Sequence, residues 1–279
     1  MKLLRVGAPG AEKPAILAAD GSIRDLSATV HDFDAATLSP GGLERLAQLD
    51  PMSLPVAAPG RIGPCVPRPL NFICIGLNYA DHAAETGAAI PKEPIVFLKS
   101  LGAFCGPNDD VHIPRGSTKT DWEVELCIVI GSRASYVSEA GAMDHVAGYC
   151  IVNDVSEREY QIERGGTWDK GKGCDTFGPT GPWLVTKDEV PDPQKLAMFL
   201  DVDGKRMQTG STATMIFGVA KLVSYVSHFM TLHPGDLIST GTPPGVGLGM
   251  KPPVYLHAGQ TMRLGIAGLG EQTQRVLQG

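Results

Sequence analysis

Two glutamates, Glu123 and Glu125, alternate with apolar residues in the segment 121–130. In an extended strand, side chains two residues apart point to the same face and lie roughly 6–7 Å apart. Both carboxylates can then bind one hard cation, whereas they would repel each other if they were buried without it. The alternative is an exposed outer face of an antiparallel strand, which is the commoner environment of glutamate.

A third carboxylate, Asp154, directly follows the apolar segment 149–153. A charge at the end of such a strand is costly unless it has a partner. Together, Glu123, Glu125 and Asp154 would form a set of oxygen ligands, which suits Mg²⁺ or Mn²⁺ rather than zinc. No H-E-x-x-H motif and no cluster of Cys and His competes for a metal.

His82 and Glu85 are three residues apart in the segment 78–85. If this segment is helical, the two side chains are neighbours. A carboxylate beside an imidazole raises its basicity and fixes its tautomer, as is needed to activate water. The competing interpretation is a surface ion pair without a catalytic role.

Two glycine-rich segments match nucleotide-binding motifs only in part. Residues 166–172 fit G-x-x-x-x-G-K, but Gly173 replaces the Ser or Thr of a P-loop, and a charged stretch precedes the motif. Residues 245–250 fail G-x-G-x-x-G at Met250, and there is no G-x-S-x-G motif. Nucleotide binding and serine hydrolysis are therefore disfavoured.

The elements that must position these residues are short. Among 279 residues there are 34 Gly and 22 Pro, which favours a mostly β, α+β fold with many turns. Strands are predicted at 72–75, 95–98, 111–113, 123–130, 149–155, 183–185, 196–202 and 237–239, with a hairpin turn at Asp203-Gly204. One long helix is predicted from Thr214 to Phe229, and the absence of βα alternation argues against a Rossmann domain.

The chain divides by composition into three parts. Residues 1–58 predict a small β-containing domain with a strand at 2–6, a hairpin about Asp20-Gly21 and a helix that begins at Ser39-Pro40. Residues 59–70 are predicted to form a proline-rich linker, and residues 71–279 a second, larger domain that carries all of the candidate catalytic residues.

The net charge of −6 gives no basic surplus for a nucleic-acid partner. The six cysteines form no C-x-x-C pair, and several lie in apolar runs, as is typical of a reducing compartment. No stretch approaches the ~20 apolar residues of a membrane span. We therefore expect a soluble, cytoplasmic protein without a membrane partner.

The chain resembles the fumarylacetoacetate hydrolase family, in particular its small bacterial acylpyruvases and 2,4-diketo-3-deoxy-sugar-acid hydrolases. The resemblance covers about residues 71–263. It rests on six segments in the family's order and spacing: IGLNYADH at 75–82, FLK at 97–99, EVE at 123–125, NDVSER at 153–158, KGK at 170–172 with DTFGP at 175–179, and TGTP at 240–243.

The resemblance implies a mixed β-sandwich roll with a small N-terminal domain, and a homodimer. It implies Mg²⁺, or Mn²⁺, on Glu123, Glu125 and Asp154. It also places several residues at positions similar to those that contact the oxyanion and the substrate or line the pocket: Arg158, Gln161, Lys172, Lys99, Thr240, Gly241 and Thr242.

The predicted reaction is hydrolysis of the C3–C4 bond of a small 2,4-dioxo acid to pyruvate and a carboxylic acid. In this hypothesis Glu85 orients His82, which activates water, and Lys172 stabilises the oxyanion. The segment 81–92 is predicted to form a lid. Alternatives are an oxaloacetate-type decarboxylase, a ureidoglycolate lyase, or a non-catalytic binding protein with a structural metal.

Overall fold

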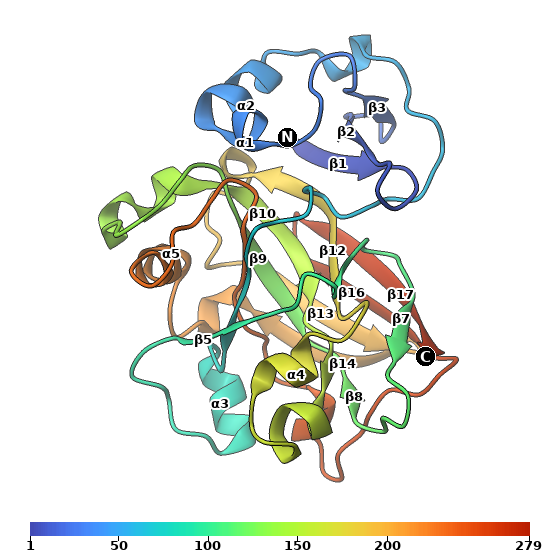
Figure 1. The fold of residues 1–279 in the computed structure, drawn as a ribbon, viewed down its shortest axis with the longest axis vertical. Coiled ribbons are helices and arrows are strands. Elements are labelled where there is room, and N and C mark those ends of the chain that lie inside the picture. Colours follow the sequence, from blue (N-terminus) through green and yellow to red (C-terminus); the bar gives the residue numbers. More distant parts are fainter.

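The computed structural model describes the backbone of residues 1–279 and every side chain except that of Thr86 (Figure 1). The fold is mostly β with short helices, as predicted. The helices are α1 Ala35–Leu38, α2 Pro40–Ala47, α3 Ala80–Thr86, α4 Trp168–Lys172 and α5 Val219–Ser227.

The largest sheet holds ten strands and contains both the N-terminal strands and the strands that carry the carboxylates. Its order is β3-β2-β1-β12-β10-β9-β15-β4-β5, and β6 pairs with β12 outside this path. Its strands are β1 Lys2–Val6, β2 Lys13–Leu17, β3 Ile23–Asp25, β4 Phe72–Gly76, β5 Ile95–Leu98, β6 Phe104–Cys105, β9 Val124–Ile130, β10 Val146–Asn153, β12 Gly178–Thr186 and β15 Leu237–Ser239.

A second sheet of five strands packs against one face of the large sheet. Its order is β14-β13-β16-β17-β7. Its strands are β7 Val111–Ile113, β13 Ala197–Val202, β14 Lys205–Ser211, β16 Thr261–Ile266 and β17 Gly270–Gln278, and a separate small pair joins β8 Thr120–Asp121 to β11 Ser156–Glu157. The side chains of Leu126 and Ile128 on β9 and of Leu264 on β16 belong to the core between the two sheets.

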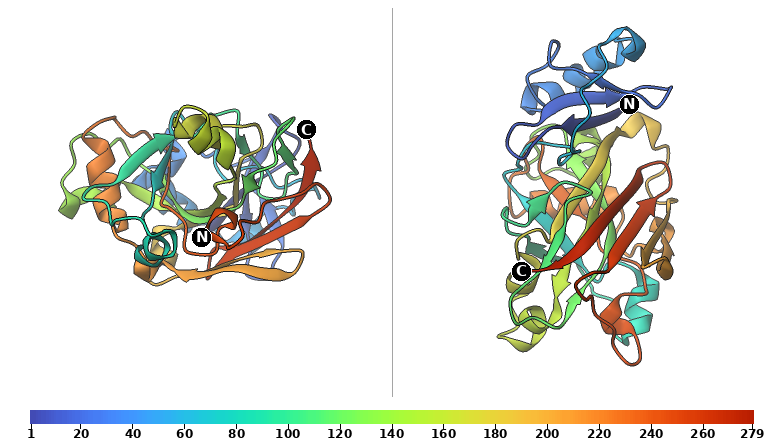
Figure 2. Two further views of the ribbon diagram at one scale, coloured as in Figure 1. Left: turned by 90° about the horizontal axis from the view of Figure 1, so that it is seen from below. Right: turned by 90° about the vertical axis from the view of Figure 1, so that its right-hand side faces the viewer.

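The opposite face of the large sheet holds a second core, and the N-terminal unit covers it. Cys127 and Val129 of β9 pack there in one cluster with Leu3, Phe33 and Leu38. Because side chains alternate along a strand, Glu123 and Glu125 lie on this same face. The N-terminal unit occupies one end of the molecule, whereas α3 and α4 lie at the other end (Figures 1 and 2).

The N-terminal elements form where the sequence predicts them. Strand β1 has the predicted bounds, and β2 and β3 form the predicted hairpin, with Gly21 at φ 82°. Ser39 caps α2 by accepting a hydrogen bond from the backbone N–H of Gly42 at 3.1 Å. Strand β1 also pairs antiparallel with β12. The N-terminal unit is therefore hydrogen-bonded into the sheet that carries the carboxylates.

The proline-rich segment 59–70 lies against the protein instead of extending into solvent. Cys65 and Val66 are fully buried in the core under the N-terminal unit. Arg61 forms ion pairs with Glu12 and Asp109, so it connects the N-terminal unit to the segment before β7.

The helix predicted from Thr214 to Phe229 is shorter in the structure, so its predicted bounds are wrong. Its regular part is α5, Val219–Ser227. The backbone N–H groups of Ile216 and Phe217 donate to the carbonyl and side-chain oxygens of Asn78, at 2.8 and 2.9 Å. Because these donors are bound by a distant residue, the helix starts only after Gly218.

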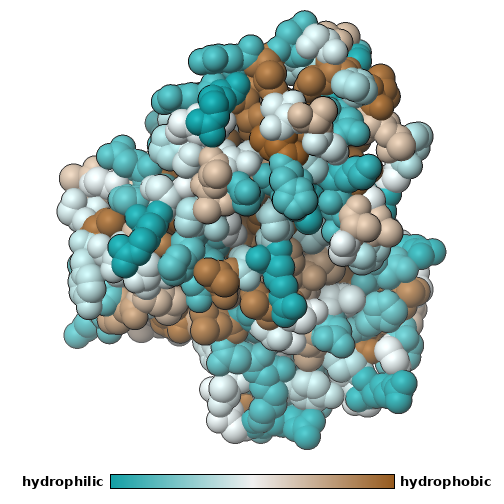
Figure 3. Space-filling model, turned by 45° about the horizontal axis from the view of Figure 1, so that its top comes forward, coloured by the Kyte–Doolittle hydropathy of each residue, from teal (hydrophilic) through white to brown (hydrophobic). Residues whose placement is uncertain are grey.

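On the face shown in Figure 3, polar side chains predominate and apolar side chains form scattered patches. Among the residues that the structure describes, no helix has the length and apolar character needed to cross a membrane.

Candidate active site

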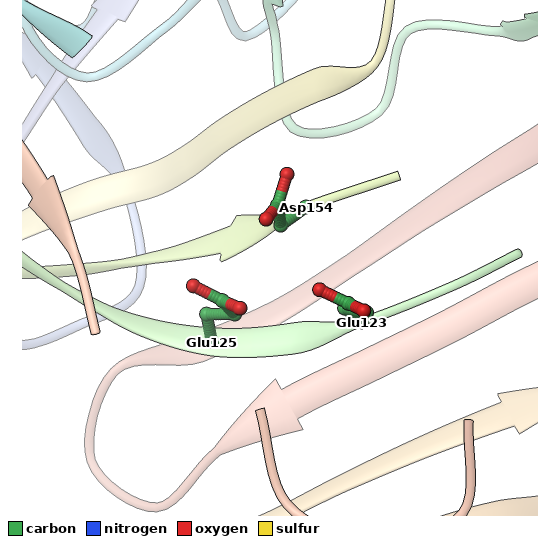
Figure 4. A group of neighbouring side chains, drawn as sticks. All are labelled: Glu123, Glu125 and Asp154. Atoms are coloured by element: carbon green, nitrogen blue, oxygen red, sulfur yellow. The ribbon is translucent and has the colours of Figure 1, made fainter. Parts of the chain in front are cut away.

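Three carboxylates meet at the end of the large sheet that the N-terminal unit leaves uncovered. Glu123 immediately precedes β9, Glu125 lies on it, and Asp154 immediately follows β10, the neighbouring antiparallel strand. One oxygen from each lies within 4.8 Å of one from each of the others. Figure 4 shows the two glutamates on one side of their strand, facing Asp154.

All three carboxylates are buried, with 6%, 1% and 0% of Glu123, Glu125 and Asp154 exposed. The side chains of this strand alternate between two faces, as predicted. The face that carries the two glutamates is buried, so the alternative of an exposed outer face is wrong. Lys172 of α4 contacts Glu123, and residues at and after the end of β15 contact Glu125.

Three cations form ion pairs with two of these carboxylates, Glu123 and Asp154. The ammonium group of Lys172 lies 2.6 Å from Glu123 Oε2 and 2.8 Å from Asp154 Oδ2. The Arg158 guanidinium lies 2.6 Å from Glu123 Oε1. Behind Asp154, Lys99 Nζ lies 2.5 Å from its Oδ1 and also donates to the carbonyl oxygen of Val155.

The two glutamates differ in their pKa values because their surroundings differ. Burial alone would raise the pKa of Glu123, but the adjacent Lys172 and Arg158 outweigh it and lower the pKa to about 2. Burial, together with the charges of Asp154 and Glu123, raises the pKa of Glu125 well above its usual value. Burial disfavours the charged form of Lys172, but Asp154 and Glu123 outweigh it and raise the pKa of Lys172 above its usual value, so it stays protonated.

The loop after β15 holds Glu125 in place. Glu125 Oε2 accepts hydrogen bonds from Ser239 Oγ at 2.6 Å and from the backbone N–H of Gly241 at 3.0 Å. The hydroxyl groups of Thr240 and Thr242 donate to backbone carbonyls of β9, each at 2.9 Å. These contacts tie the loop to the strand that carries both glutamates.

His82 and Glu85 lie together on α3, as the spacing predicts. Nδ1 of His82 lies 3.1 Å from Glu85 Oε2. The Glu85 carboxylate also accepts hydrogen bonds from the backbone N–H of Gly245, at 3.0 and 3.2 Å. Glu85 is therefore fixed by a second segment of the chain, and it holds the imidazole from one side. All of helix α3 except its first residue, Ala80, falls in the predicted lid segment 81–92.

One cavity of about 150 Å³ brings most of the predicted site residues together. Its lining includes His82, the three carboxylates, Arg158, Gln161, Lys172, Gly241 and Thr242. Lys99, Glu85 and Thr240 are not part of this lining. The first two instead contact residues that line it, and Thr240 binds the backbone of β9.

The sequence alone suggests no role for Asp121, although this residue organises the site. Its carboxylate accepts hydrogen bonds from Arg158 Nε at 2.8 Å and from the backbone N–H groups of Trp122, Gly247 and Leu248 at 2.8, 2.7 and 2.9 Å. Its only sequence signal is its position two residues before Glu123.

The donor chemistry of the site fits a divalent cation. The carboxylates of Glu123, Glu125 and Asp154 supply only oxygen, the type of ligand that Mg²⁺ and Mn²⁺ prefer. Burying three carboxylates so close together is costly, and a bound cation would offset their mutual repulsion. These three residues are the ones that would hold the ion.

Comparisons with known sequences show which proteins the chain is similar to. Residues 71–277 match the family model described as fumarylacetoacetate (FAA) hydrolase C-terminal. A protein of Burkholderia multivorans, which carries only the general name hydrolase, is 66% identical over 276 residues, or 98% of each chain.

Solved structures of similar fold include a fumarylacetoacetate hydrolase from Exiguobacterium antarcticum, with a TM-score of 0.88 and 34% identity over 100% of both chains. A maleylpyruvate hydrolase from Sphingobium, solved with manganese(II) and pyruvate, has a TM-score of 0.82 and 28% identity over 100% of both chains. A 5-carboxymethyl-2-hydroxymuconate delta-isomerase from Mycobacterium smegmatis has a TM-score of 0.77 and 30% identity over 100% of this chain and 99% of its own. The similar structures thus include both hydrolases and an isomerase.

Proposed function

The chain belongs to the fumarylacetoacetate hydrolase family, and from this we propose that it is a metal-dependent hydrolase of small 2,4-dioxo acids. It would cleave the C3–C4 bond and yield pyruvate and a carboxylic acid. The observation that carries the proposal is the convergence of the carboxylate trio, His82 and Lys172 on one small cavity. The complex of the similar maleylpyruvate hydrolase with manganese(II) and pyruvate supports the same chemistry.

Glu123, Glu125 and Asp154 would hold Mg²⁺ or Mn²⁺, which when bound supplies a Lewis acid for the 2-oxo acid. Glu85 holds Nδ1 of His82, so we assign proton transfer to Nε2. His82 takes a proton from water, and the water oxygen adds to C4. When the C3–C4 bond breaks, its electron pair stays with C3, which gains a proton.

Lys172 and Gln161 are assigned to the negative charge that develops on the C4 oxygen. The pKa of Lys172 is raised above its usual value, against the effect of burial, by Asp154 and Glu123, so its ammonium group stays charged at working pH. Arg158 contacts both Gln161 and Glu123, at 3.0 and 2.6 Å, and so fixes the amide relative to the carboxylates. Such preorganised donors stabilise a developing charge most strongly in a site that excludes water.

The test is pyruvate release from acylpyruvates, measured with purified protein before and after treatment with a chelator. We expect loss of activity on chelation and recovery with Mg²⁺ or Mn²⁺. The Glu123→Gln and His82→Ala variants should each lose at least about 100-fold in kcat/KM, whereas Glu139→Gln, at an exposed position, should not change it. Full turnover by Glu123→Gln would contradict the proposal.

The same assay distinguishes the alternatives. Decarboxylation of oxaloacetate or glyoxylate release from ureidoglycolate, without acylpyruvate cleavage, would replace the hydrolase assignment. Isomerisation of an unsaturated hydroxy acid without bond cleavage would do the same. Thermal stabilisation by metal without any turnover would indicate a binding protein. The His82–Glu85 pair favours the hydrolase, since decarboxylation needs no activated water. The homodimer stays a prediction from the resemblance, and the cytoplasmic location stays a prediction from the cysteine pattern and the lack of a long apolar stretch.

A further inference from the structure

The cavity that holds the carboxylates also has an apolar side, whose residues take no part in the proposed mechanism. This side is formed by Ile75, Leu77, Phe97, Ile162, Trp168 and Leu248. We call these six residues the apolar wall. They come from β4 and the residue after it, β5, the turn 159–163, α4 and the loop 247–249, so the wall exists only in the folded protein.

Two aromatic rings connect the wall to the reacting end of the cavity. The Phe97 and Trp168 rings pack edge to face with their centroids 5.3 Å apart. The centroid of the Phe97 ring also lies 5.3 Å from the Lys172 ammonium group. Both rings line the same cavity as Lys172, so a substrate group bound beside Lys172 can contact them.

Gly76 allows the Trp168 ring to take this position. A Cβ atom at residue 76 would lie 2.3 Å from the ring, so the ring packs directly against the backbone of β4. Ile162 and Leu248 complete the wall. Ile162 is 50% exposed, and Leu248 is half-buried, so the apolar surface reaches the solvent side of the cavity.

The cations of the cavity are already paired. Among the lining residues that the structure describes, Lys172 contacts Glu123 and Asp154, and Arg158 contacts Glu123 and also Asp121. A second carboxylate at the far end of a substrate would therefore compete with these contacts or lie against the wall without a counter-ion. Burial of an unpaired charge is strongly unfavourable.

The neutral hydrogen-bonding groups of the lining leave few partners for a substrate chain beyond C4, since the amide N–H groups of Gln161 are already assigned to the C4 oxygen. The oxygen of the Gln161 side chain accepts from Arg158. The Thr242 hydroxyl donates to the carbonyl of Val124 and accepts from Gln208. A polyhydroxylated chain would lose hydrogen bonds to water on entering this side of the cavity, with few replacements.

We infer that the protein selects 2,4-dioxo acids whose acyl group beyond C4 is a short apolar chain, and that the apolar wall binds this chain. The inference rests on the proposed function, because it places the C4 oxygen near Lys172. The volume of about 150 Å³ lies below the ~300–1,000 Å³ typical of drug-sized ligand sites, so the chain is short. Substrates with a terminal carboxylate or several hydroxyl groups are disfavoured.

The main test compares kcat/KM for acids that differ only beyond C4. We expect kcat/KM to rise about tenfold from acetylpyruvate to butanoylpyruvate, because two methylene groups are added against an apolar surface. Pentanoylpyruvate should exceed succinylpyruvate, of similar length but with a terminal carboxylate, by about 100-fold or more. A diketo sugar acid should have a kcat/KM as low as that of succinylpyruvate. Equal or better turnover of either polar acid would overturn the inference.

A substitution at the solvent end of the wall tests its role directly. Ile162 is half exposed, so Ile162→Lys should fold and would supply the missing counter-ion. We expect this variant to raise the ratio of succinylpyruvate to pentanoylpyruvate turnover by at least about tenfold. The control is Leu70→Lys, at a position that is 68% exposed and outside the cavity lining, which should leave the ratio unchanged. An unchanged ratio in Ile162→Lys would exclude the wall as the subsite.

A binding measurement separates failure of this inference from failure of the proposed function. If no dioxo acid is cleaved, the hydrolase assignment is wrong, but the Kd values of 2-oxoheptanoate and 2-oxopimelate can still be compared by titration of Trp fluorescence in the presence of Mg²⁺. These acids have equal length and differ by the terminal carboxylate. Tighter binding of 2-oxoheptanoate supports the apolar subsite, and tighter binding of 2-oxopimelate overturns it.

Discussion

Asp121 shows how one buried carboxylate can connect a catalytic group to a distant loop. Its two oxygens accept hydrogen bonds from Arg158 and from the backbone of Gly247 and Leu248. Arg158 in turn contacts Glu123. The position of the Leu248 side chain in the apolar wall is thus coupled to the position of a proposed metal ligand.

We therefore expect Asp121→Asn to impair catalysis without unfolding the protein. Asparagine has the same shape, but its NH₂ group cannot accept the bonds that one carboxylate oxygen accepts. Loss of such a supporting contact should lower kcat/KM by about 10–100-fold. Steady-state kinetics and a thermal melt would measure this. Asp110→Asn, which removes an exposed pair with Arg275, is the control, and wild-type kinetics in Asp121→Asn would contradict the prediction.

A second prediction at this scale concerns Glu125 and metal removal. In Glu125→Gln the side chain loses its charge beside Asp154 and Glu123, while the amide oxygen can still accept from Ser239 and Gly241. We expect Mg²⁺ or Mn²⁺ to raise the Tm of the wild-type protein by several degrees and to raise that of Glu125→Gln much less. Differential scanning calorimetry with and without chelator measures both. Equal metal shifts in the two proteins would remove Glu125 from the ligand set.

At the scale of elements, β10 and β12 approach each other closely at Gly148. A Cβ atom at this position would lie 2.1 Å from the carbonyl oxygen of Val185 on β12. Because both strands belong to the central sheet, little room exists for either backbone to move.

Gly148→Ala should therefore lower the free energy of unfolding by about 1–3 kcal/mol or more. Gly141→Ala is the matched control, since the nearest atom to its Cβ is Ser138 Oγ, at an ordinary contact distance of 3.6 Å. Urea denaturation of the two variants gives the comparison. A loss in Gly148→Ala no larger than in Gly141→Ala would show that the strands can separate locally.

The elements that the sequence predicts well are those with a simple pattern of apolar residues. Strands β5, β7 and β15 have the predicted bounds, because each is a short apolar or alternating run between turn residues. The hairpin of β16 and β17 was not predicted. Its Gln272 and Gln274 are fully buried. Gln272 donates hydrogen bonds to carbonyls of β10 and β12, and Gln274 accepts one from Asn153. Because these core residues are polar, the sequence of β17 does not show the apolar pattern of a core strand.

The candidate site was predictable to a similar degree. Residue spacing alone predicts that Glu123 and Glu125 share one face and that His82 and Glu85 are neighbours. The metal role of the glutamates was predicted only with Asp154 and the family resemblance added. The apolar wall was not predictable, because the contact of Trp168 with Gly76 joins residues 92 positions apart in the sequence. The sequence around Trp168 contains no feature that distinguishes this residue from a tryptophan in the core.

At the scale of the whole molecule, the N-terminal unit and the carboxylates share one face of one sheet. Leu3, Leu26, Phe33 and Leu38 are 0–1% exposed where they cover this face. Removing the unit would expose Val129 and its neighbours to water and would leave β12 without its partner β1.

We expect a variant that lacks residues 1–58 to aggregate or to lose its cooperative thermal transition. The intact chain cleaved once within residues 55–60 should by contrast stay folded, because the sheet contacts of β1 and β2 remain. Gel filtration and thermal melts of the two forms make the comparison. A soluble, cooperatively folding deletion variant would show that residues 71–279 are stable alone.

The position of β15 also determines when the site can form during synthesis. Residues 237–239 lie between β9 and β4 in the sheet and supply the Ser239 contact to Glu125. At 5–20 residues per second, the ribosome needs about 4–17 s after residue 153 to reach residue 239. During that interval the edges of β4 and β9 have no partner strand between them. The nascent chain therefore carries two unpaired strand edges, which are open to pairing with other chains until β15 has emerged.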